Sequence, residues 1–351
     1  MDLRWSRGFG LALLGRDVPE HAVEWARAAE RAGFGSVWIA EDYYQPGAFT
    51  LAGAVAAATE RITVGLGVVN PYTRHPAILA METAALAGVA PGRIVLGLGT
   101  SNPNWIEAEM RIPFKTPLRT LGEGVEIVRR LLAGETLGFH GELFDLDSVR
   151  LEYVPAHPVP IVLGVKAPKA LRLAGEIADG VHGAVLTSPD HVRRIRATAS
   201  EARSLRRASA PPGNAGMPRS DDFAVVAYVP VAVSTDGRTA RDTVKPLLAR
   251  YLGVLHGQSI LRDAGLGPDV TQPFADAFRR GATATALITD AMIDRLAVAG
   301  TPDDCRAALR RLADAGLDAP IAVLSQHADV VSQITSIGET LAPFWRDIRC
   351  R

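Results

Sequence analysis

The amino-acid sequence predicts a (β/α)8 TIM barrel with insertions at its C-terminal face, and three observations favour this α/β fold. Eight short segments are apolar on both faces, which is typical of strands in a parallel sheet that is covered on both sides. Helical patterns separate most of these segments, as a barrel of alternating strands and helices requires. The first strand–helix turn, LLGRDVPEH (13–21), lacks the glycine-rich fingerprint of a dinucleotide-binding sheet. The alternative is a doubly wound sheet with an extra domain.

The predicted strands are short runs dominated by Val, Ile, Leu, Ala and Gly. In chain order they are expected at residues 9–14, 36–40, 62–69, 94–98, 161–165, 181–185, 223–233 and 319–324. The third strand contains Gly65 and Gly67, which weaken a strand unless a bulge or the close approach of a ligand requires them. Tight packing of a helix across the strand is the alternative reason, and we favour the ligand because polar residues follow directly.

The predicted helices show apolar residues at helical spacing or begin at a proline. They are expected at residues 19–32, 50–59, 75–90, 118–132, 168–178, 189–206, 236–255, 302–315 and from about 329 onward. Residues 136–153 alternate around His140-Gly141 and predict a hairpin, and residues 208–220 predict a loop. We expect one domain over residues 1–351, with an insertion at about 257–299 that has helices of its own.

Composition excludes several classes of protein. The chain has 351 residues, and its 38 basic and 38 acidic side chains give no net charge, so we expect no nucleic-acid partner. Two cysteines rule out a disulfide framework, and eight scattered histidines with no paired spacing argue against a metal site. No apolar run approaches the roughly 20 residues of a membrane helix. The N-terminal segment is interpreted as a first strand, not a signal peptide, so a cytoplasmic protein is expected.

Active sites of such barrels lie where the strands end. Glu41 and Asp42 follow the second strand and are candidates for proton handling, with an ordinary solvated loop as the alternative. Asn70 follows the third strand. Gly97 and Gly99 clear space beside the fourth strand, where three small polar residues then offer hydrogen bonds, namely Thr100, Ser101 and Asn102.

A phosphate site is predicted late in the barrel. Gly164, Lys166 and Ala167 precede a helix that begins at Pro168, so backbone amides and positive charge would face an anion. Thr187 and Ser188 stand before the next helix in the same way. The alternative for both is plain helix capping. Because no G-x-S-x-G elbow or nucleophilic cysteine is recognisable, we expect an organic cofactor to carry the chemistry.

At these residues the sequence resembles the bacterial luciferase-like superfamily, and within it the coenzyme F420-dependent branch that includes methylenetetrahydromethanopterin reductase. The resemblance covers nearly the whole chain. Four stretches carry it, namely GFGSVWIAED (33–42), ITVGLGVVNPYTRHPAILA (62–80), GRIVLGLGTS (92–101) and PIVLGVKAPKALRLAGEIADGV (160–181). The second and fourth stretches are specific.

The resemblance implies a barrel that binds a deazaflavin or a flavin at its C-terminal face. A bulge with a non-proline cis peptide would back the ring, and the matching pair here is Gly67-Val68. The other matching positions would bind phosphate (Gly164, Lys166, Ala167, Thr187 and Ser188) or line the ring (Asn70, Thr100 and Ser101). Asn102, a further cofactor-binding candidate, stands where sugar-phosphate dehydrogenases of this branch have a catalytic Glu. This departure argues against the oxidation of sugar phosphates with the same proton donor. It leaves Glu41 and Asp42 as the acid/base candidates.

The expected function is therefore that of an F420-dependent oxidoreductase that transfers a hydride between the deazaflavin and a small organic substrate. An FMN-dependent monooxygenase is the first alternative, and a cofactor-binding barrel without turnover is the second. We expect no membrane partner, and we expect the chain to form a homodimer. The residues that would select the substrate lie at 101–117, 136–153 and 257–299, and they show no signature of its identity.

Overall fold

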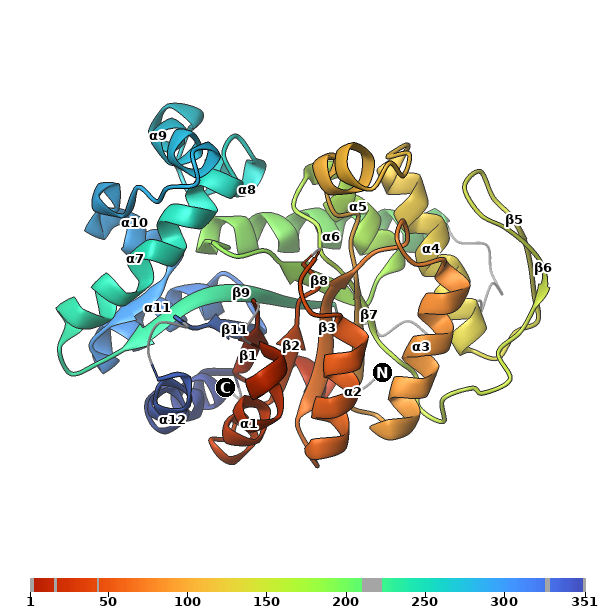
Figure 1. The fold of residues 1–351 in the computed structure, drawn as a ribbon, viewed down its shortest axis with the longest axis horizontal. Coiled ribbons are helices and arrows are strands. Elements are labelled where there is room, and N and C mark those ends of the chain that lie inside the picture. The colour runs from red at the N-terminus through yellow and green to blue at the C-terminus, as the bar shows by residue number, and fades with distance from the viewer. Residues whose placement is uncertain (1–2, 16–17, 43, 210–222, 326–328, 350–351) are drawn as a thin grey trace.

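The computed structural model describes residues 3–15, 18–42, 44–209, 223–325 and 329–349. Within these ranges eight parallel strands form a closed barrel in the order β1-β2-β3-β4-β7-β8-β9-β11, with β11 pairing to β1 (Figure 1). Their bounds are β1 Gly10–Leu13, β2 Ser36–Ile39, β3 Thr63–Val69, β4 Ile94–Leu98, β7 Ile161–Leu163, β8 Gly180–Gly183, β9 Ala224–Val233 and β11 Ala319–Val323. The predicted barrel is confirmed, and every predicted strand coincides with one of these.

Helices cover the outside of the barrel (Figure 1). Their bounds are α1 Val18–Arg31, α2 Ala48–Ala58, α3 Pro76–Val89, α4 Pro117–Leu132, α5 Pro168–Ile177, α6 Pro189–Ser209, α7 Gly237–Val254, α11 Pro302–Asp314, α12 Val330–Thr340 and α13 Ala342–Arg349, with a short 3-10 turn η1 at Leu3–Ser6. The start of α11 shows why the boundaries were predictable, because Thr301 and Asp304 form a capping box. The chain after Asp329 was expected to be one helix, but it breaks at Leu341 into α12 and α13. Most of the predicted loop at 208–220 lies outside the described residues.

Two excursions leave the barrel. The predicted hairpin is present as the antiparallel pair β5 Leu137–His140 and β6 Asp145–Val149. Residues 257–299 contain the short elements α8 Ser259–Asp263, α9 Pro268–Arg279, η3 Thr285–Leu287 and α10 Asp290–Leu296, which gather around α7 (Figure 1). The strand β10 Val298–Gly300 follows and pairs with the end of β9. A three-residue strand leaves no periodicity in a sequence, and it was not predicted.

Alternate strand residues belong to two apolar clusters. One contains Leu66, Leu96 and many helix residues, and it fills the space between barrel and helices. The other contains Trp38 and Val95 inside the barrel and continues into the contact of α7 with α9, through residues such as Leu248 and Phe274. A Cβ on Gly65 would lie 2.4 Å from the Trp38 ring, so this glycine makes room for an interior tryptophan. For Gly65, both the ligand and the helix-packing explanations were therefore wrong.

Among the described helices, none is both long and apolar enough to cross a lipid bilayer.

Candidate active site

The third strand carries a bulge at the position that the resemblance implied. The peptide bond between Gly67 and Val68 is cis, and the pairing of β3 with β4 changes register between Leu66 and Val69. The predicted cis peptide is confirmed. The bulge turns the half-buried side chain of Val68 toward β4 and β7.

Three glycines surround that side chain, Gly97 in β4, Gly99 directly after β4 and Gly164 directly after β7, and we call them the Val68 cradle. A Cβ on any of them would lie 2.7–2.8 Å from a methyl group of Val68. Gly97 and Gly99 were expected to clear space at the site, and Gly164 was expected to bind phosphate. The structure shows that a protein side chain occupies the space instead, so any cofactor would contact the bulge above the cradle.

A cluster of Trp38, His182 and Tyr228 lies beneath the bulge, inside the barrel. The ring centroids of His182 lie 4.8 Å from Trp38 and 4.4 Å from Tyr228. The Tyr228 hydroxyl donates a hydrogen bond of 2.8 Å to the Gly67 carbonyl. A Cβ on Gly67 would lie 2.9 Å from His182 Nε2 and from the Tyr228 hydroxyl, so protein atoms fill the inner side of this glycine. Sequence reasoning missed His182 and Tyr228, because each stands in a strand that is otherwise apolar.

His182 should make the fold sensitive to acid. Burial lowers the pKa of His182 to about 3, whereas an unfolded histidine titrates near 6.5. Between these values the unfolded chain binds the extra proton, so stability falls as pH falls. We expect the free energy of unfolding to drop by about 1.4 kcal/mol from this residue between pH 7.5 and 5.5. Urea unfolding at both pH values measures it.

In the variant His182→Asn, the free energy of unfolding should fall by about 1.4 kcal/mol less between pH 7.5 and 5.5 than in the wild-type protein. The variant should also be less stable than the wild-type protein at both pH values. His157→Asn, which replaces an exposed histidine, is the matched control and should keep the wild-type difference. A His182→Asn protein with the full wild-type pH dependence would contradict the assignment.

The two acids after β2 have different surroundings. Glu41 pairs with Arg74 at 2.6 Å, and Arg74 also pairs with Glu82 at 3.3 Å and lies over the Phe49 ring. Glu41 is thus held in a fixed ion pair. This arrangement orients the loop after β3 and removes Glu41 as the first choice for proton transfer.

Asp42 faces the interior cluster instead. Burial raises the pKa of Asp42, and the opposing charge of Arg250 on α7 offsets only part of this effect. Burial, followed by the negative charge of Asp42, raises the pKa of both Tyr228 and Tyr251. Asp42 can therefore take up or release a proton closer to neutral pH than an ordinary aspartate, beside two tyrosines that stay protonated.

The polar candidates after β3 and β4 shape their loops. The Asn70 side-chain oxygen accepts hydrogen bonds of 3.0 Å from the backbone of Tyr72 and of Thr73. The Asn102 side-chain oxygen accepts one of 3.1 Å from the Trp105 backbone at the start of η2 Asn104–Glu109, a short π-helical segment. Thr100 is half-buried, and the exposed Ser101 has a positive φ of 61°. The structure therefore shows Asn70 and Asn102 fixing the backbone of the loops after β3 and β4.

The predicted phosphate residues lie at two helix starts. Ala167 is the N-cap of α5 and, within the described chain, no side chain caps this helix, so its first amides face outward beside the half-buried Lys166. Burial lowers the pKa of Lys166. Ser188 is buried and caps α6 by accepting a hydrogen bond from the His191 backbone, and the Thr187 hydroxyl donates to the Ala184 carbonyl at 2.6 Å. Helix capping, the alternative to phosphate binding, thus explains the position of the Ser188 hydroxyl.

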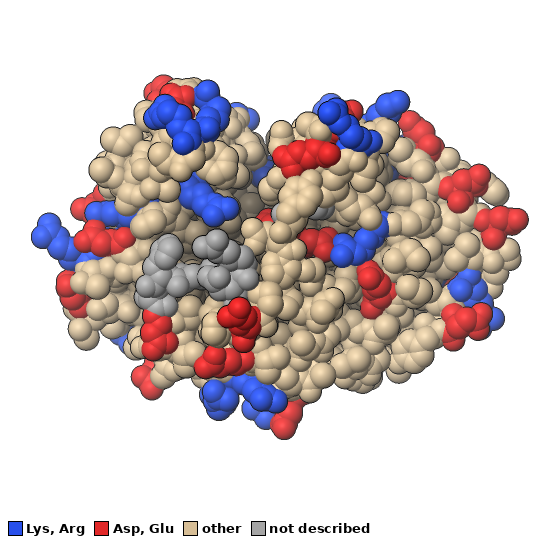
Figure 2. Space-filling view, viewed as in Figure 1, with Lys and Arg blue, Asp and Glu red and all other residues tan. Residues whose placement is uncertain are grey.

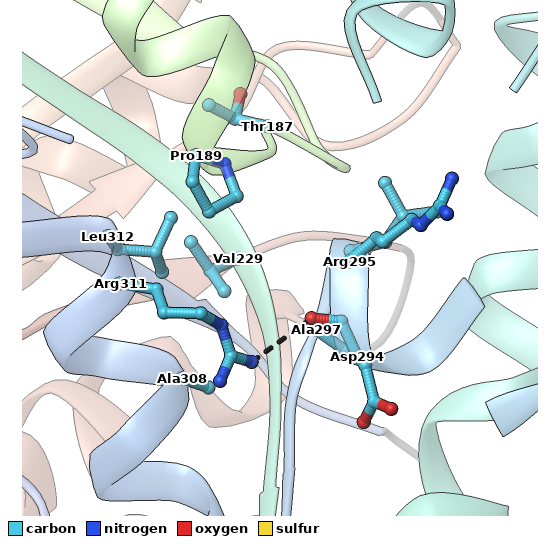
Figure 3. A pocket seen from close by; sticks show the side chains of 10 residues that line it. Thr187, Pro189, Val229, Asp294, Arg295, Ala297, Ala308, Arg311 and Leu312 are labelled. Atoms are coloured by element: carbon cyan, nitrogen blue, oxygen red, sulfur yellow. Dashed lines mark hydrogen bonds between the residues drawn. The ribbon is translucent and has the colours of Figure 1, made fainter. Parts of the chain in front are cut away.

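A small cavity borders Thr187 at the start of α6. Thr187, Pro189 and Val229 line it, together with Arg311, which donates a hydrogen bond to the Asp294 carbonyl (Figure 3). Its volume of about 10 Å³ is the size of one water molecule. An organic cofactor needs the open surface instead. Figure 2 shows that surface hollowed between the lobe of α8 and α9 and the lobe that follows β4.

In the described ranges no group of His, Cys, Asp and Glu side chains is arranged to hold a metal ion.

The geometry defines a (β/α)8-barrel protein whose polar groups gather at the carboxyl ends of the strands, beside a bulged third strand. The profile of the luciferase-like monooxygenase family matches residues 7–319, and the chain belongs to this family.

The chain is similar to named proteins over part or nearly all of its length. It is 30% identical over 313 residues to 5,10-methylenetetrahydromethanopterin reductase of Methanolobus tindarius, covering 88% of this chain and 91% of that protein. It is 38% identical over 173 residues to F420-dependent glucose-6-phosphate dehydrogenase of Nakamurella multipartita, covering 46% and 51%. The solved coenzyme F420-dependent tetrahydromethanopterin reductase from Methanopyrus kandleri superposes with a TM-score of 0.84 at 25% identity, covering 97% of this chain and 99% of that one.

Proposed function

We propose that this protein is an F420-dependent oxidoreductase that transfers a hydride between the deazaflavin and a small organic substrate. The observation that carries the proposal is the whole-length similarity to methylenetetrahydromethanopterin reductases, one of which is solved as an F420-dependent enzyme. The similarity to an F420-dependent dehydrogenase supports the same cofactor over about half of the chain.

The residues present fit a cofactor that combines a flat ring with a phosphate. Val68 offers an apolar backing for the ring, held in place by the Val68 cradle. The uncapped amides of α5, with Gly164, Lys166 and Ala167, suit an anion. Asn70, Thr100, Ser101 and Asn102 would border the ring, and Thr187 and Ser188 would lie beside the phosphate. When bound, F420 supplies the hydride and, unlike a reduced flavin, does not react readily with oxygen.

The chain supplies the proton handling and the positioning. Asp42 would hold or deliver a proton at its carboxylate, because burial raises the pKa of that group into a more useful range. Glu41 acts as a positioning residue through Arg74. Substrate would enter through the hollow between the two lobes, so the segment with α8 and α9 and the loop after β4 are in position to select it (Figure 2).

An anaerobic assay tests the proposed reaction. Reduced F420 is mixed with the protein and a panel of carbonyl, imine and activated alkene substrates, and oxidation of the coenzyme is followed by its absorbance. We expect at least one substrate to be reduced by F420 in this assay. In a second assay, carried out in air with reduced FMN, we expect no substrate to be oxygenated. Oxygen consumption that depends on substrate and reduced FMN would support the monooxygenase alternative. Binding of F420 without any turnover would support the non-catalytic alternative.

We also propose a homodimer through α2 and α3. Both helices are predominantly apolar, with Glu82 of α3 as their one charged residue, and on α3 the large side chains of Ile78, Met81 and Val89 are 44–52% exposed. The surface over these helices in Figure 2 is largely uncharged. A helix that is apolar on all sides is normally buried, which favours a second copy of the chain as the cover.

The variant Met81→Asp should be monomeric, because burial of an unpaired carboxylate in an apolar interface is strongly unfavourable. Size-exclusion chromatography with light scattering should then change from twice the chain mass to 37.3 kDa. Leu205→Asp, which replaces an exposed leucine on α6, is the control and should stay dimeric. A wild-type mass of 37.3 kDa would refute the proposed dimer.

A further inference from the structure

A buried pair of titratable side chains joins α8 to α6. His191, in the first turn of α6, and Asp263, the last residue of α8, are 0% and 2% exposed. The distance from His191 Nδ1 to Asp263 Oδ2 is 2.7 Å. The other oxygen of Asp263 pairs with Arg194 at 2.7 Å. No role in the proposed proton transfer uses this pair.

One nitrogen of His191 is unsatisfied. Because an ionised Asp263 can only accept a hydrogen bond, His191 Nδ1 carries the hydrogen and Nε2 presents a bare lone pair. That Nε2 atom is buried and has no hydrogen-bond partner among the described residues. Buried polar atoms are nearly always satisfied, so an unpaired one in a well-packed protein indicates a missing partner.

His191 lies next to the predicted phosphate site, because its backbone N–H donates a hydrogen bond of 3.2 Å to the hydroxyl of Ser188. Nδ1 faces α8, so Nε2 lies on the opposite edge of the ring, and His191 is close enough to the Lys166 ammonium for the two charges to interact. The Ser259 hydroxyl, at the start of α8, donates a hydrogen bond of 2.9 Å to the Lys166 carbonyl. The helix α8 therefore contacts both turns that carry the phosphate candidates, one through each of its ends.

We propose that His191 is a phosphate-binding residue that takes up a proton when the cofactor binds, with Asp263 holding its second N–H. The proposal rests on the proposed function, because the phosphate belongs to the bound cofactor. In the bound state Nδ1–H donates to Asp263 and Nε2–H donates to a phosphate oxygen. The proton comes from solvent, and no other group changes its charge.

The surrounding charges explain why the proton arrives with the ligand. Burial is the largest influence and lowers the pKa of His191 in the free protein, while Asp263 raises it and the cations Arg194 and Lys166 lower it. Free His191 is therefore neutral at pH 7.5. A phosphate adds negative charge beside Nε2 and reverses this balance. Affinity should then fall as pH rises, by up to tenfold per pH unit between the free and the bound pKa values.

Calorimetric titration of F420 at pH 7.5, in three buffers with different ionisation enthalpies, measures the proton uptake. We expect about one proton per coenzyme for the wild-type protein. His191→Gln keeps an N–H donor of similar reach but cannot titrate, so it should bind F420 with proton uptake near zero. Asp263→Asn removes the charged acceptor of the Nδ1–H hydrogen bond and should lower the proton uptake as well. This variant replaces His191→Gln in the test if His191→Gln does not fold.

The control is His256→Gln. His256, in the turn after α7, has a similar contact, 2.8 Å from Nδ1 to the Thr271 hydroxyl of α9, which joins it to α9 and not to α6. This variant should keep the full proton uptake. Equal uptake in the wild-type protein and His191→Gln, or no uptake in the wild-type protein, would overturn the inference while F420 binding itself is retained. Absence of any F420 binding would instead overturn the proposed function, and the inference with it.

Discussion

Replacing Asp42 with Asn should lower kcat for F420-linked turnover by about 10²–10⁴-fold, the range expected for loss of a positioned general acid or base. Asp42 is the acid whose pKa is raised by burial, and it faces Tyr228 and Tyr251, whereas Glu41 is occupied by Arg74. Asparagine has nearly the same shape as aspartate, but its side-chain amide cannot take up or release a proton in this pH range. The measurement is the pH dependence of kcat and kcat/KM, in which the limb that reports Asp42 should disappear in the variant.

Glu41→Gln is the matched comparison. It removes the charge that holds Arg74, so we expect mainly a higher KM and a pH profile of wild-type shape. Wild-type kcat/KM in the Asp42→Asn protein would show that Asp42 is not the proton carrier. In that case water, or a residue of the 257–299 segment, would carry the proton.

The second large effect is expected at the Val68 cradle. Gly164→Ala should weaken F420 binding at least tenfold and destabilise the fold by about 1–3 kcal/mol, as overpacking does. The reason is geometric, because the new Cβ would lie 2.8 and 3.0 Å from the two methyl groups of Val68. The next contact, 3.5 Å to Val68 Cβ, is ordinary. Urea unfolding and F420 titration measure both effects.

The double variant Gly164→Ala/Val68→Ala should recover most of the stability, because Val68→Ala removes both clashing methyl groups. A coupling free energy of about 1–3 kcal/mol is expected from the double-mutant cycle. Gly138→Ala on β5 is the control, since no described atom lies within 4 Å of its added Cβ. Strictly additive effects at positions 68 and 164 would contradict the description of the cradle.

Fold prediction succeeded where local sequence determines local structure. Strands of a closed parallel barrel are apolar on both faces, and helix starts such as Thr301-Pro302 have their own chemistry. The two failures have different causes. The strand β10 is recognisable only from its pairing with the end of β9. The break at Leu341 had a local signal that the prediction of one continuous helix overlooked, because Pro343 stands in the first turn of α13 and has no N–H with which to continue α12.

Site prediction located the strand ends but could not distinguish the roles of the side chains there. Glu41 and Asp42 are adjacent in sequence, and what separates them is Arg74, which lies 33 residues away, and the tyrosines of β9 and α7. Gly65, Gly97 and Gly99 were predicted to leave space and Gly164 to bind phosphate, yet Trp38 fills the space beside Gly65 and Val68 lies against the other three. His191 and Asp263 are 72 residues apart, so only the folded chain brings them together.

The most direct test of the account is a fluorescence titration of the purified cofactor-free protein with F420 and, separately, with FMN. The helix starts and Lys166 suit the phosphate of either cofactor, so the preference depends on the bulge at Gly67-Val68 and on the residues around it. We predict saturable binding of F420 that is at least tenfold tighter than binding of FMN. Tighter binding of FMN would contradict the account and move this protein to the flavin-dependent monooxygenases.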